Sequence, residues 1–173
     1  MKPILNQQQI LLTIRRLANQ LIENHISFEN TVLIGIQPRG IYLSDKIVQE
    51  ILNELGNIKL NYGKLDITFY RDDPRKEFHV ANQTDIAFSI ESKKVVLIDD
   101  VLYTGRTIRA AMDALMDFGR PDKVELLVLI DRRYSRQLPI QPDYVGKSID
   151  SIISQKVKVQ WQENGGIDEV QLI

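Results

Sequence analysis

Apolar residues recur along this chain in two patterns that alternate from the N-terminus to the C-terminus. Apolar positions spaced by three and four residues predict three helices, at residues 6–22, 41–55 and 107–118. Short uninterrupted apolar runs predict buried strands between them, at residues 31–36, 95–98 and 124–130. Weaker patterns predict further strands, at residues 64–70, 157–161 and 170–173. This alternation predicts an α/β fold with a mostly parallel twisted sheet flanked by helices.

Polar residues and glycines mark where the predicted helices begin and end. Asn6 with Gln9 three residues later is typical of a capping box at the start of a helix, and Gly56 is a good residue just past a helix end. The stretch 71–94 is polar and weakly patterned, apart from a brief alternation at 86–90 that predicts one short strand. A long loose segment inside a compact domain is typical of a functional or mobile insertion.

Composition narrows the class of protein. The 173 residues are 43% hydrophobic and 26% charged, and the formal net charge is −1, so we expect one soluble globular domain over residues 1–173. With no cysteine, the chain has no disulfide, no thiolate nucleophile and no cysteine metal site. Only two histidines are present, which argues against a histidine-rich metal site.

Membrane insertion and secretion are not expected either. The longest apolar run covers only residues 126–130, whereas a helix needs roughly 20 residues to cross a bilayer. The N-terminus lacks the apolar region of a signal peptide, so a cytoplasmic location is expected. Near-zero net charge argues against a protein whose whole surface binds nucleic acid, but a local basic face remains possible.

One segment carries recognisable chemistry. Ligands of parallel sheets bind beyond the carboxyl ends of the strands, so the turns after the three apolar runs are the candidate positions. Asp99 and Asp100 end one of these runs, and Thr104-Gly-Arg-Thr107 follows and leads into a predicted helix. Backbone N–H groups at a helix start, threonine hydroxyls and a close backbone approach at Gly105 suit a phosphate monoester.

Two carboxylates beside a bound phosphate repel it unless another group lies between them. The hydroxyls of a ribose can donate to Asp99 and Asp100 while its 5-phosphate binds the Thr-Gly-Arg-Thr loop. A pyrophosphate on C1 of that ribose would require Mg²⁺ to offset its charge. The carboxylates would favour the positive charge that develops on the ribose ring as the pyrophosphate leaves. The structural alternative is that the acids merely end a strand and Thr104 caps a helix; the combined pattern favours the functional interpretation.

The motif Asp99-Asp-Val-Leu-Tyr-Thr-Gly-Arg-Thr107 resembles the phosphoribosyl pyrophosphate (PRPP) signature of type I phosphoribosyltransferases. Five other motifs resemble the bifunctional pyrimidine operon attenuator / uracil phosphoribosyltransferase (PyrR) family, at residues 34–40, 67–73, 119–121, 138–140 and 143–147. The likeness covers residues 17–161. It implies a type I phosphoribosyltransferase fold with a small hood over the active site, which corresponds here to residues 66–94.

The resemblance also implies an activity and partners. Family members convert uracil and PRPP, with Mg²⁺, to UMP and pyrophosphate (EC 2.4.2.9). Many bind the leader mRNA of the pyrimidine operon, which uridine nucleotides promote, and they form dimers or larger homo-oligomers. Two alternatives remain open: a PRPP-sensing regulator with little turnover, and a type I transferase for another base.

The resemblance assigns catalytic roles to Asp99, Asp100, Arg39 and Arg71. The substrate-binding residues it assigns are Pro38, Gly40, Val101, Leu102, Tyr103, Thr104, Gly105, Arg106, Thr107, Asp131 and Arg132. No metal ligand is assigned to the protein, because Mg²⁺ reaches the site with PRPP.

The turn 35–40 is compared with a nucleotide P-loop because it has the spacing Gly-x₄-Gly. Ile41 stands where that motif needs Lys, so the P-loop interpretation fails, and the resemblance assigns this turn to pyrophosphate instead. Pro38 replaces the usual Thr of the family and removes one N–H. Without the resemblance, Arg39 could be a solvated loop charge and Arg71 a surface ion-pair partner.

The base-binding run departs from the family. The usual Asp-Arg-Gly-His-Arg-Glu-Leu-Pro is here Asp131-Arg-Arg-Tyr-Ser-Arg-Gln-Leu-Pro139, one residue longer and without the Gly. The RNA-binding residues that the resemblance assigns are Arg15, Arg16, Arg136 and Lys147. Asn19, Asn24 and Gln141 replace basic residues common in relatives, and the bland alternative for Arg15 and Arg16 is the solvated face of an amphipathic helix.

Overall fold

A five-stranded parallel sheet forms the centre of the molecule, in the strand order β3-β2-β4-β5-β6. The computed structural model describes residues 2–72, 81 and 83–173. The strands are β2 (Thr31–Ile36), β3 (Asn61–Leu65), β4 (Lys94–Leu102), β5 (Lys123–Arg133) and β6 (Tyr144–Asp150). This architecture confirms the predicted α/β class.

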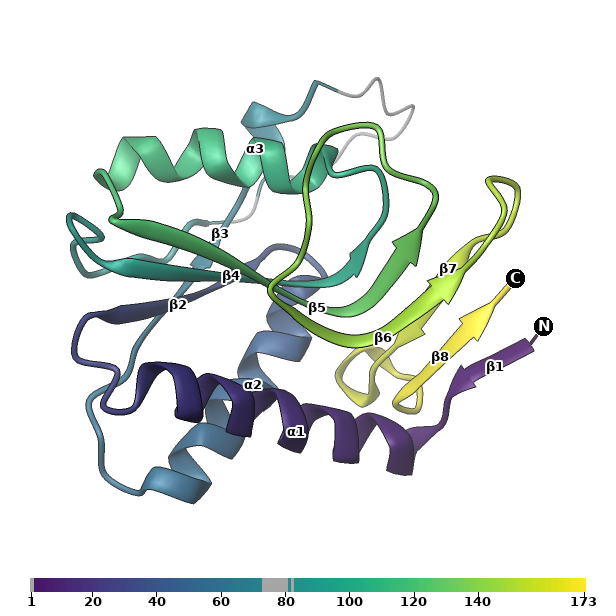
Figure 1. Cartoon of the computed structure of the whole chain (residues 1–173), viewed down its shortest axis with the longest axis horizontal. Coiled ribbons are helices and arrows are strands. Elements are labelled where there is room, and N and C mark those ends of the chain that lie inside the picture. Colours follow the sequence, from purple (N-terminus) through teal and green to yellow (C-terminus); the bar gives the residue numbers. More distant parts are fainter. Residues whose placement is uncertain (1, 73–80, 82) are drawn as a thin grey trace.

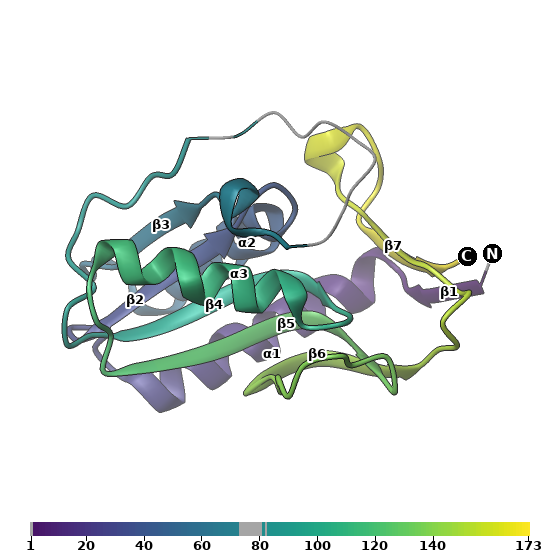
Figure 2. The ribbon, with the colours of Figure 1, turned by 90° about the horizontal axis from the view of Figure 1, so that it is seen from above.

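Helices cover both faces of this sheet. Helices α1 (Gln7–His25) and α2 (Gly40–Leu55) lie on one face, and α3 (Arg106–Leu115) lies on the other (Figure 1). Seen from above, α3 runs along the sheet over β4 (Figure 2). Side chains alternate along the strands, so Leu33 packs under α1 and α2 while Ile34 packs under α3. Two apolar cores result, one on each face.

The helix ends agree with the sequence signals. The Asn6 side chain accepts from the Gln9 backbone N–H at 2.9 Å, and the Gln9 side chain accepts from the Asn6 N–H at the same distance. At the C-terminal end of α2, the Gly56 N–H donates to the Leu52 carbonyl at 2.9 Å. These bonds satisfy backbone groups that a helix end otherwise leaves without partners.

A second, antiparallel sheet joins the two ends of the chain, in the order β1-β8-β7. Its strands are β1 (Lys2–Leu5), β7 (Val157–Gln160) and β8 (Glu169–Leu172), and both termini lie beside it (Figure 1). Trp161 is 1% exposed and anchors this sheet to the core beneath α1 and α2. Lys46 of α2 adds ion pairs to Glu163 and Asp168 at 2.8 and 3.3 Å.

Two strand predictions are wrong. Residues 64–70 are not one strand: β3 ends at Leu65, and a 3₁₀ turn, η1 (Thr68–Tyr70), follows. The Asp66 carboxylate accepts from both the backbone N–H and the hydroxyl of Thr68, and such local bonds favour a turn over a strand. The stretch 86–90 contains no strand, because the pairing with β3 is a single bridge between Lys64 and Asp85.

Other boundaries moved. The central strands β4 and β5 run past their apolar stretches, so Asp99, Asp100 and Asp131 lie inside strands rather than in the following turns. The helix predicted to reach residue 118 stops at Leu115 and continues as a 3₁₀ turn, η2 (Met116–Phe118). Strands β1 and β6 were not predicted. Of the predicted hood at 66–94, residues 73–80 and 82 lie outside the described residues.

Candidate active site

A cavity of about 570 Å³ opens where β2, β4 and β5 end. Its wall is formed by the carboxyl ends of those strands, by the segments that follow them, by α3 and by the small sheet. The residues around it are Ile36, Gln37, Pro38, Arg39, Arg71, Asp99, Asp100, Val101, Leu102, Tyr103, Thr104, Gly105, Arg106, Thr107, Ile108, Arg132, Gln137, Lys156, Val157 and Val159. This is the edge of a parallel sheet where ligands bind.

The structure gathers most of the predicted site residues around this cavity. The four predicted catalytic residues line it, namely Arg39, Arg71, Asp99 and Asp100. The predicted substrate-binding residues that also line it are Pro38, Val101, Leu102, Tyr103, Thr104, Gly105, Arg106, Thr107 and Arg132. Gly40 and Asp131 lie outside its lining: Gly40 packs against β4, and Asp131 is bonded to Arg136. The catalytic and binding roles stay predictions.

Gly40 permits a close approach between the turn at 37–40 and strand β4. A Cβ atom on Gly40 would lie 2.6 Å from the Ile98 carbonyl oxygen and 3.0 Å from the Asp99 Cα. Real side chains do not tolerate such distances from backbone atoms, so any other residue would push the turn away from the acids. Gly40 therefore brings Arg39 close to the carboxylates.

Asp99 and Asp100 are buried side by side, at 6% and 7% exposure. The Asp100 backbone N–H donates to the Asp99 carboxylate at 2.9 Å. Burial, reinforced by the charge of Asp100, raises the pKa of Asp99 well above its usual value, although Arg71 opposes the shift. Burial also raises the pKa of Asp100, with Arg39 opposing. Two acids in this state favour a cationic or hydrogen-bonding ligand.

The Thr104–Thr107 segment forms a tight loop into α3. Gly105 has φ +93°, a left-handed conformation that favours glycine, and helix α3 begins at the next residue. The Thr104 hydroxyl accepts from the Arg106 backbone N–H at 3.3 Å. Arg71 donates to the Thr107 hydroxyl at 3.4 Å, so the start of the predicted hood reaches the loop. The loop that is predicted to bind phosphate therefore lies beside the acids and lines the same cavity.

The segment after Tyr70 is also tied to α3. The Asp72 carboxylate accepts from Arg106 at 3.1 Å and from Arg109 at 2.6 Å. The Tyr70 hydroxyl donates to the carboxylate of Asp117. These contacts hold Arg71 on the cavity side of the helix.

The predicted base-binding residues lie next to this loop. The Arg132 guanidinium is buried and stacks on the ring of Tyr103 at 4.0 Å. It also donates to the Ser151 hydroxyl at 2.9 Å, which fixes its position. Asp131 is buried in the same strand and accepts from Arg136 at 2.5 Å. Arg132 therefore presents a cation at the cavity wall, while Asp131 pairs with Arg136 outside that wall.

Seven lining residues were missed: Ile36, Gln37, Ile108, Gln137, Lys156, Val157 and Val159. Gln37 and Gln137 stand inside segments that sequence motifs had already marked, so proximity to those motifs could have found them. Val157 and Val159 belong to β7 of the small sheet and Lys156 immediately precedes it, so all three lie after the last motif, at residues 143–147. Nothing in the local pattern identified that sheet as a wall of the cavity.

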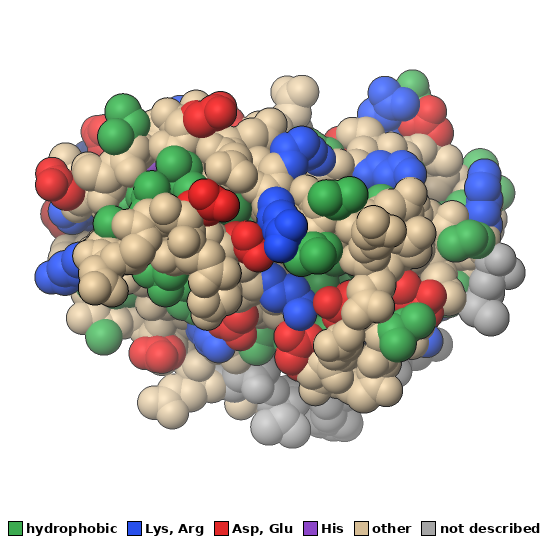
Figure 3. All heavy atoms as spheres, turned by 90° about the horizontal axis from the view of Figure 1, so that it is seen from below, with side chains coloured by type: hydrophobic (Ala, Val, Ile, Leu, Met, Phe, Trp, Pro, Cys, Tyr) green, Lys and Arg blue, Asp and Glu red, His purple; other side chains and the backbone are tan. Residues whose placement is uncertain are grey.

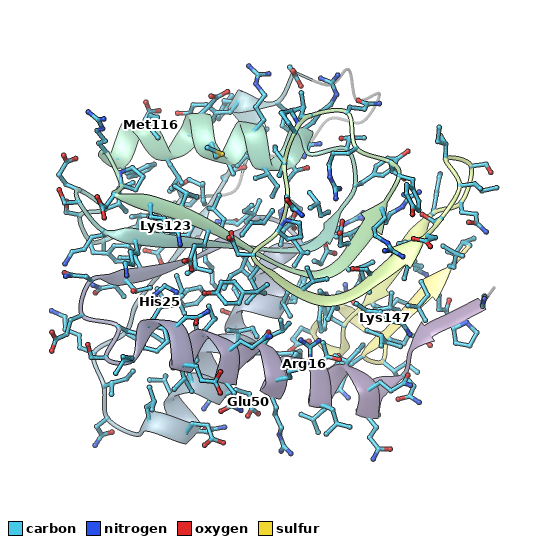
Figure 4. All side chains as sticks on the ribbon, viewed as in Figure 1. Arg16, His25, Glu50, Met116, Lys123 and Lys147 are labelled. Atoms are coloured by element: carbon cyan, nitrogen blue, oxygen red, sulfur yellow. The ribbon has the colours of Figure 1, made fainter. Side chains whose placement is uncertain are left out.

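The structure separates the predicted RNA-binding residues. Arg16 donates to the backbone carbonyls of Val145 and Gly146 at 3.2 and 2.6 Å, and Lys147 donates to the Ile4 carbonyl at 3.1 Å. Both therefore lie along β6 and α1 (Figure 4).

Arg15 of the same helix is 3.8 Å from Glu50 of α2. Seen from below, the Lys and Arg side chains lie among Asp and Glu rather than in one continuous patch (Figure 3). Arg136 is instead bonded to Tyr103 and Asp131 beside the cavity. Its part in an RNA-binding surface stays a prediction.

Two absences apply to the residues that the structure describes. No helix within that part of the chain is long and apolar enough to cross a membrane. No group of three or more His, Cys, Asp or Glu side chains in the same residues could hold a metal ion.

Comparisons with known proteins define the class. The family model described as "Phosphoribosyl transferase domain" matches residues 1–164. The hypoxanthine phosphoribosyltransferase of Trypanosoma cruzi superposes with a TM-score of 0.75 at 16% identity, covering 99% of this chain and 95% of that one. The Staphylococcus aureus hypoxanthine phosphoribosyltransferase gives a TM-score of 0.73 at 22% identity, covering 98% and 90%. At such identities these two structures show the fold, and the family model makes it that of a phosphoribosyltransferase.

Curated relatives narrow the class to one family. The bifunctional protein PyrR of Halalkalibacterium halodurans is 46% identical, covering 96% of this chain and 94% of the relative. The one of Haemophilus ducreyi is 44% identical, covering 99% and 96%. The chain belongs to the bifunctional PyrR family of phosphoribosyltransferases, and the predicted family, fold and enzyme class are confirmed.

Proposed function

We propose that this chain transfers the phosphoribosyl group of PRPP to uracil, forming UMP and pyrophosphate. One observation carries the proposal: two adjacent buried carboxylates and the Thr104–Thr107 loop face the same cavity, with Arg39 and Arg71 beside them. The carboxylates suit ribose hydroxyls, the loop suits a 5-phosphate, and the arginines suit a pyrophosphate.

The reaction forms one bond and breaks one. Uracil N1 bonds to C1 of the ribose, the bond between C1 and the pyrophosphate oxygen breaks, and pyrophosphate leaves with the electron pair. The N1 proton passes to solvent. Positive charge that develops on the ribose is stabilised by Asp99 and Asp100, and Arg39 and Arg71 stabilise the negative charge on the leaving group.

The residues of the cavity fit a Mg²⁺ ion that is bound by PRPP. The carboxylates of Asp99 and Asp100 place negative charge near the position of that ion without binding it directly, and burial with a raised pKa makes a nearby cation favourable for both. The ion would supply charge neutralisation on the pyrophosphate. A cation that keeps most of its bonds to phosphate oxygens and water needs no larger cluster of protein ligands.

The base site lies next to Tyr103. The ring of Tyr103 and the guanidinium of Arg132 stack on each other at the cavity wall, and Asp131 and Arg136 support them. A planar base can pack against such a surface while backbone groups bind its carbonyls. The longer run at 131–139 makes base choice the first property to measure.

The decisive experiment supplies PRPP, Mg²⁺ and one base at a time. We expect UMP from uracil and no nucleotide from hypoxanthine, guanine or orotate. A nucleotide from another base would keep the mechanism and overturn the substrate. No product from any base, with PRPP still bound, would favour a PRPP-sensing regulator.

We propose a second function, binding of the pyrimidine operon leader mRNA, promoted by uridine nucleotides. The family of bifunctional relatives and the cations Arg15, Arg16 and Lys147 along α1 and β6 support it. In a filter-binding titration, leader RNA affinity should fall as salt rises. Lys147→Gln should lower the slope of log affinity against log salt concentration by about the amount that corresponds to one phosphate contact. Equal affinity for leader RNA and a scrambled sequence would contradict this function.

We also propose that the chain acts in the cytoplasm as a dimer or larger homo-oligomer, with residues 1–173 as one domain and 66–94 as its hood. The contacts of Arg71 and Asp72 with α3 support the hood. Light scattering at several protein concentrations should give a mass above that of one chain; a monomer mass throughout would contradict the oligomer.

A further inference from the structure

Arg136 connects the phosphate loop of the candidate site with the first residue of the base-binding run. One of its guanidinium nitrogens donates to the Tyr103 carbonyl at 2.7 Å, and another donates to the Asp131 carboxylate at 2.5 Å. Tyr103 follows β4 at the start of the phosphate loop, whereas Asp131 lies in β5 and is the first residue of the base-binding run. The Arg136 side chain is 22% exposed and that of Asp131 is 11% exposed, so this pair is largely removed from water.

The residues after Arg136 continue the same contact. The backbone N–H groups of Gln137 and Leu138 both donate to the Thr104 carbonyl, at 2.9 and 3.2 Å. The side chain of Gln137 accepts from the Arg106 Nε at 2.8 Å. A Cβ on Gly105 would lie 3.2 Å from the Ile140 side chain, so segment 136–140 packs directly against the loop.

These bonds orient two successive peptide groups of the phosphate loop. In a trans peptide the carbonyl and the N–H point in opposite directions. Arg136 holds the Tyr103 carbonyl, so the N–H of Thr104 points away from segment 136–140. Gln137 and Leu138 hold the Thr104 carbonyl, so the N–H of Gly105 also points away from it. Thr104 and Gly105 both line the cavity, where such donors bind phosphate.

We propose that Arg136 is a positioning residue of the transferase, which sets the phosphate loop for PRPP and couples that loop to the base-binding run through Asp131. The inference rests on the proposed function for its substrate. It assigns Arg136 to the active site, whereas the sequence resemblance assigns it to RNA. When the N–H groups of Thr104 and Gly105 are already oriented before PRPP arrives, binding loses no free energy to ordering the loop. Loss of Arg136 should therefore weaken PRPP binding.

The test compares Arg136→Gln with Arg136→Lys, and uses Arg133→Gln as the matched control. Arg133 is an arginine of the same run, but it is half-exposed, pairs with Asp150 and does not line the cavity. Calorimetry with PRPP and Mg²⁺ measures the dissociation constant without any turnover. We expect Arg136→Gln to raise it by on the order of 10- to 100-fold, the effect of losing a charge-assisted hydrogen bond. Arg136→Lys should recover part of the loss, and Arg133→Gln should match the wild type.

A coupling measurement separates positioning from a general loss of stability. The effects of Arg136→Gln and Asp131→Asn on PRPP binding should be far from additive, because both remove the same contact. If the Gln variant does not fold, the Lys variant still carries the test, since it keeps the cation and loses the two-pronged geometry.

Two results would overturn the inference. One is a folded Arg136→Gln variant with wild-type affinity for PRPP; the other is loss of leader RNA binding alone, with PRPP binding intact. The proposed transferase function fails separately, through absence of UMP from the wild-type protein. PRPP affinity remains measurable in that case, so the two failures are distinguishable.

Discussion

At the scale of single residues, the acids Asp99 and Asp100 show a conflict between stability and function. Both are buried next to each other, and burial raises the pKa of each. Ionising either group inside the protein costs more than in the unfolded chain, by about 1.4 kcal/mol for each unit by which its pKa is raised. Arg71 and Arg39 compensate only part of this cost, and we expect the hydroxyls of a bound ribose to supply the rest.

We therefore expect Asp99→Asn to stabilise the protein while it lowers turnover by on the order of 100-fold. A carboxyl whose pKa is raised on folding loses stability as pH rises above its unfolded pKa of about 3.9, and the amide removes that loss. The gain in melting temperature should thus be larger at about pH 8 than at about pH 4. A variant that melts below the wild type at the higher pH would contradict this account.

Thr104 provides a second residue-scale prediction. Thr104→Ala removes a hydroxyl at the phosphate loop, and a hydrogen bond to a charged group contributes roughly 1.5–3 kcal/mol. We expect PRPP affinity to fall by about 10-fold or more, with uracil affinity changed less. Calorimetry with each ligand measures both. An unchanged PRPP dissociation constant would argue against the loop as the phosphate site.

At the scale of elements, a buried polar network ties helix α1 to the start of the sheet, at the end of the strands opposite the cavity (Figure 4). His25 bonds Thr31 of β2 and Glu125 of β5, each at 2.9 Å. The same carboxylate accepts from Tyr144 of β6 at 2.9 Å and from Lys123 at 2.8 Å. The Glu125 side chain of β5 thus joins helix α1 to the neighbouring strand β6.

Replacing that carboxylate should destabilise the fold. Burial raises the pKa of Glu125, but hydrogen bonds from Lys123, Tyr144 and His25 outweigh it, so the pKa lies below the usual value. A lowered pKa contributes stability above the unfolded pKa of about 4.3 and loses it as pH falls through the folded pKa. We expect Glu125→Gln to cost about 1–3 kcal/mol at neutral pH.

Urea denaturation of Glu125→Gln and the wild type checks this. Their difference in unfolding free energy should shrink as pH falls from about 4.3 through the lowered pKa of Glu125, because the wild-type carboxylate becomes protonated there. PRPP binding should be unaffected, since the network lies at the other end of the sheet. A constant difference at every pH would show that packing, not the charge, accounts for the loss.

At the scale of the whole molecule, the site depends on the small sheet built from both ends of the chain. That sheet contributes Lys156, Val157 and Val159 to the cavity wall, and Trp161 fixes it to the core beneath α1 and α2. A contact between the C-terminal strands and the centre of the fold thus completes a site whose motifs all lie earlier in the chain.

Trp161→Ala should therefore affect both stability and binding. Removing a fully buried aromatic side chain costs about 3–5 kcal/mol. Thermal unfolding should show that loss, and PRPP binding to the remaining folded protein should weaken as the wall loosens. The exposed Ile167 in the turn before β8 offers a control, since Ile167→Ala removes an apolar side chain that is mostly in water. Equal melting of the Trp161 variant and the wild type would contradict the anchoring role.

Much of this arrangement could be predicted from local patterns. The periodicity of apolar residues located α1, α2 and most of α3, because a helix buries one face and repeats every few residues. The interiors of β2, β4 and β5 are continuous apolar runs, because both faces of a parallel sheet are covered. Strand β6 gave a weaker signal, since it is a partly exposed edge strand with only Tyr144 buried.

By itself, the sequence determined the three helices, the central apolar strands β2, β4 and β5, the acid pair, the Thr104–Thr107 loop and the family, because each is encoded by adjacent residues in a restrictive pattern. Only the tertiary structure decided where Asp131 and Arg136 bond, which wall Lys156 joins, and that the acids lie inside β4. A hydrogen bond to a carbonyl such as that of Tyr103 depends on where two distant segments of backbone meet. The residue types Tyr103 and Arg136 do not indicate that these two segments come together, so this contact is decided only by the tertiary fold.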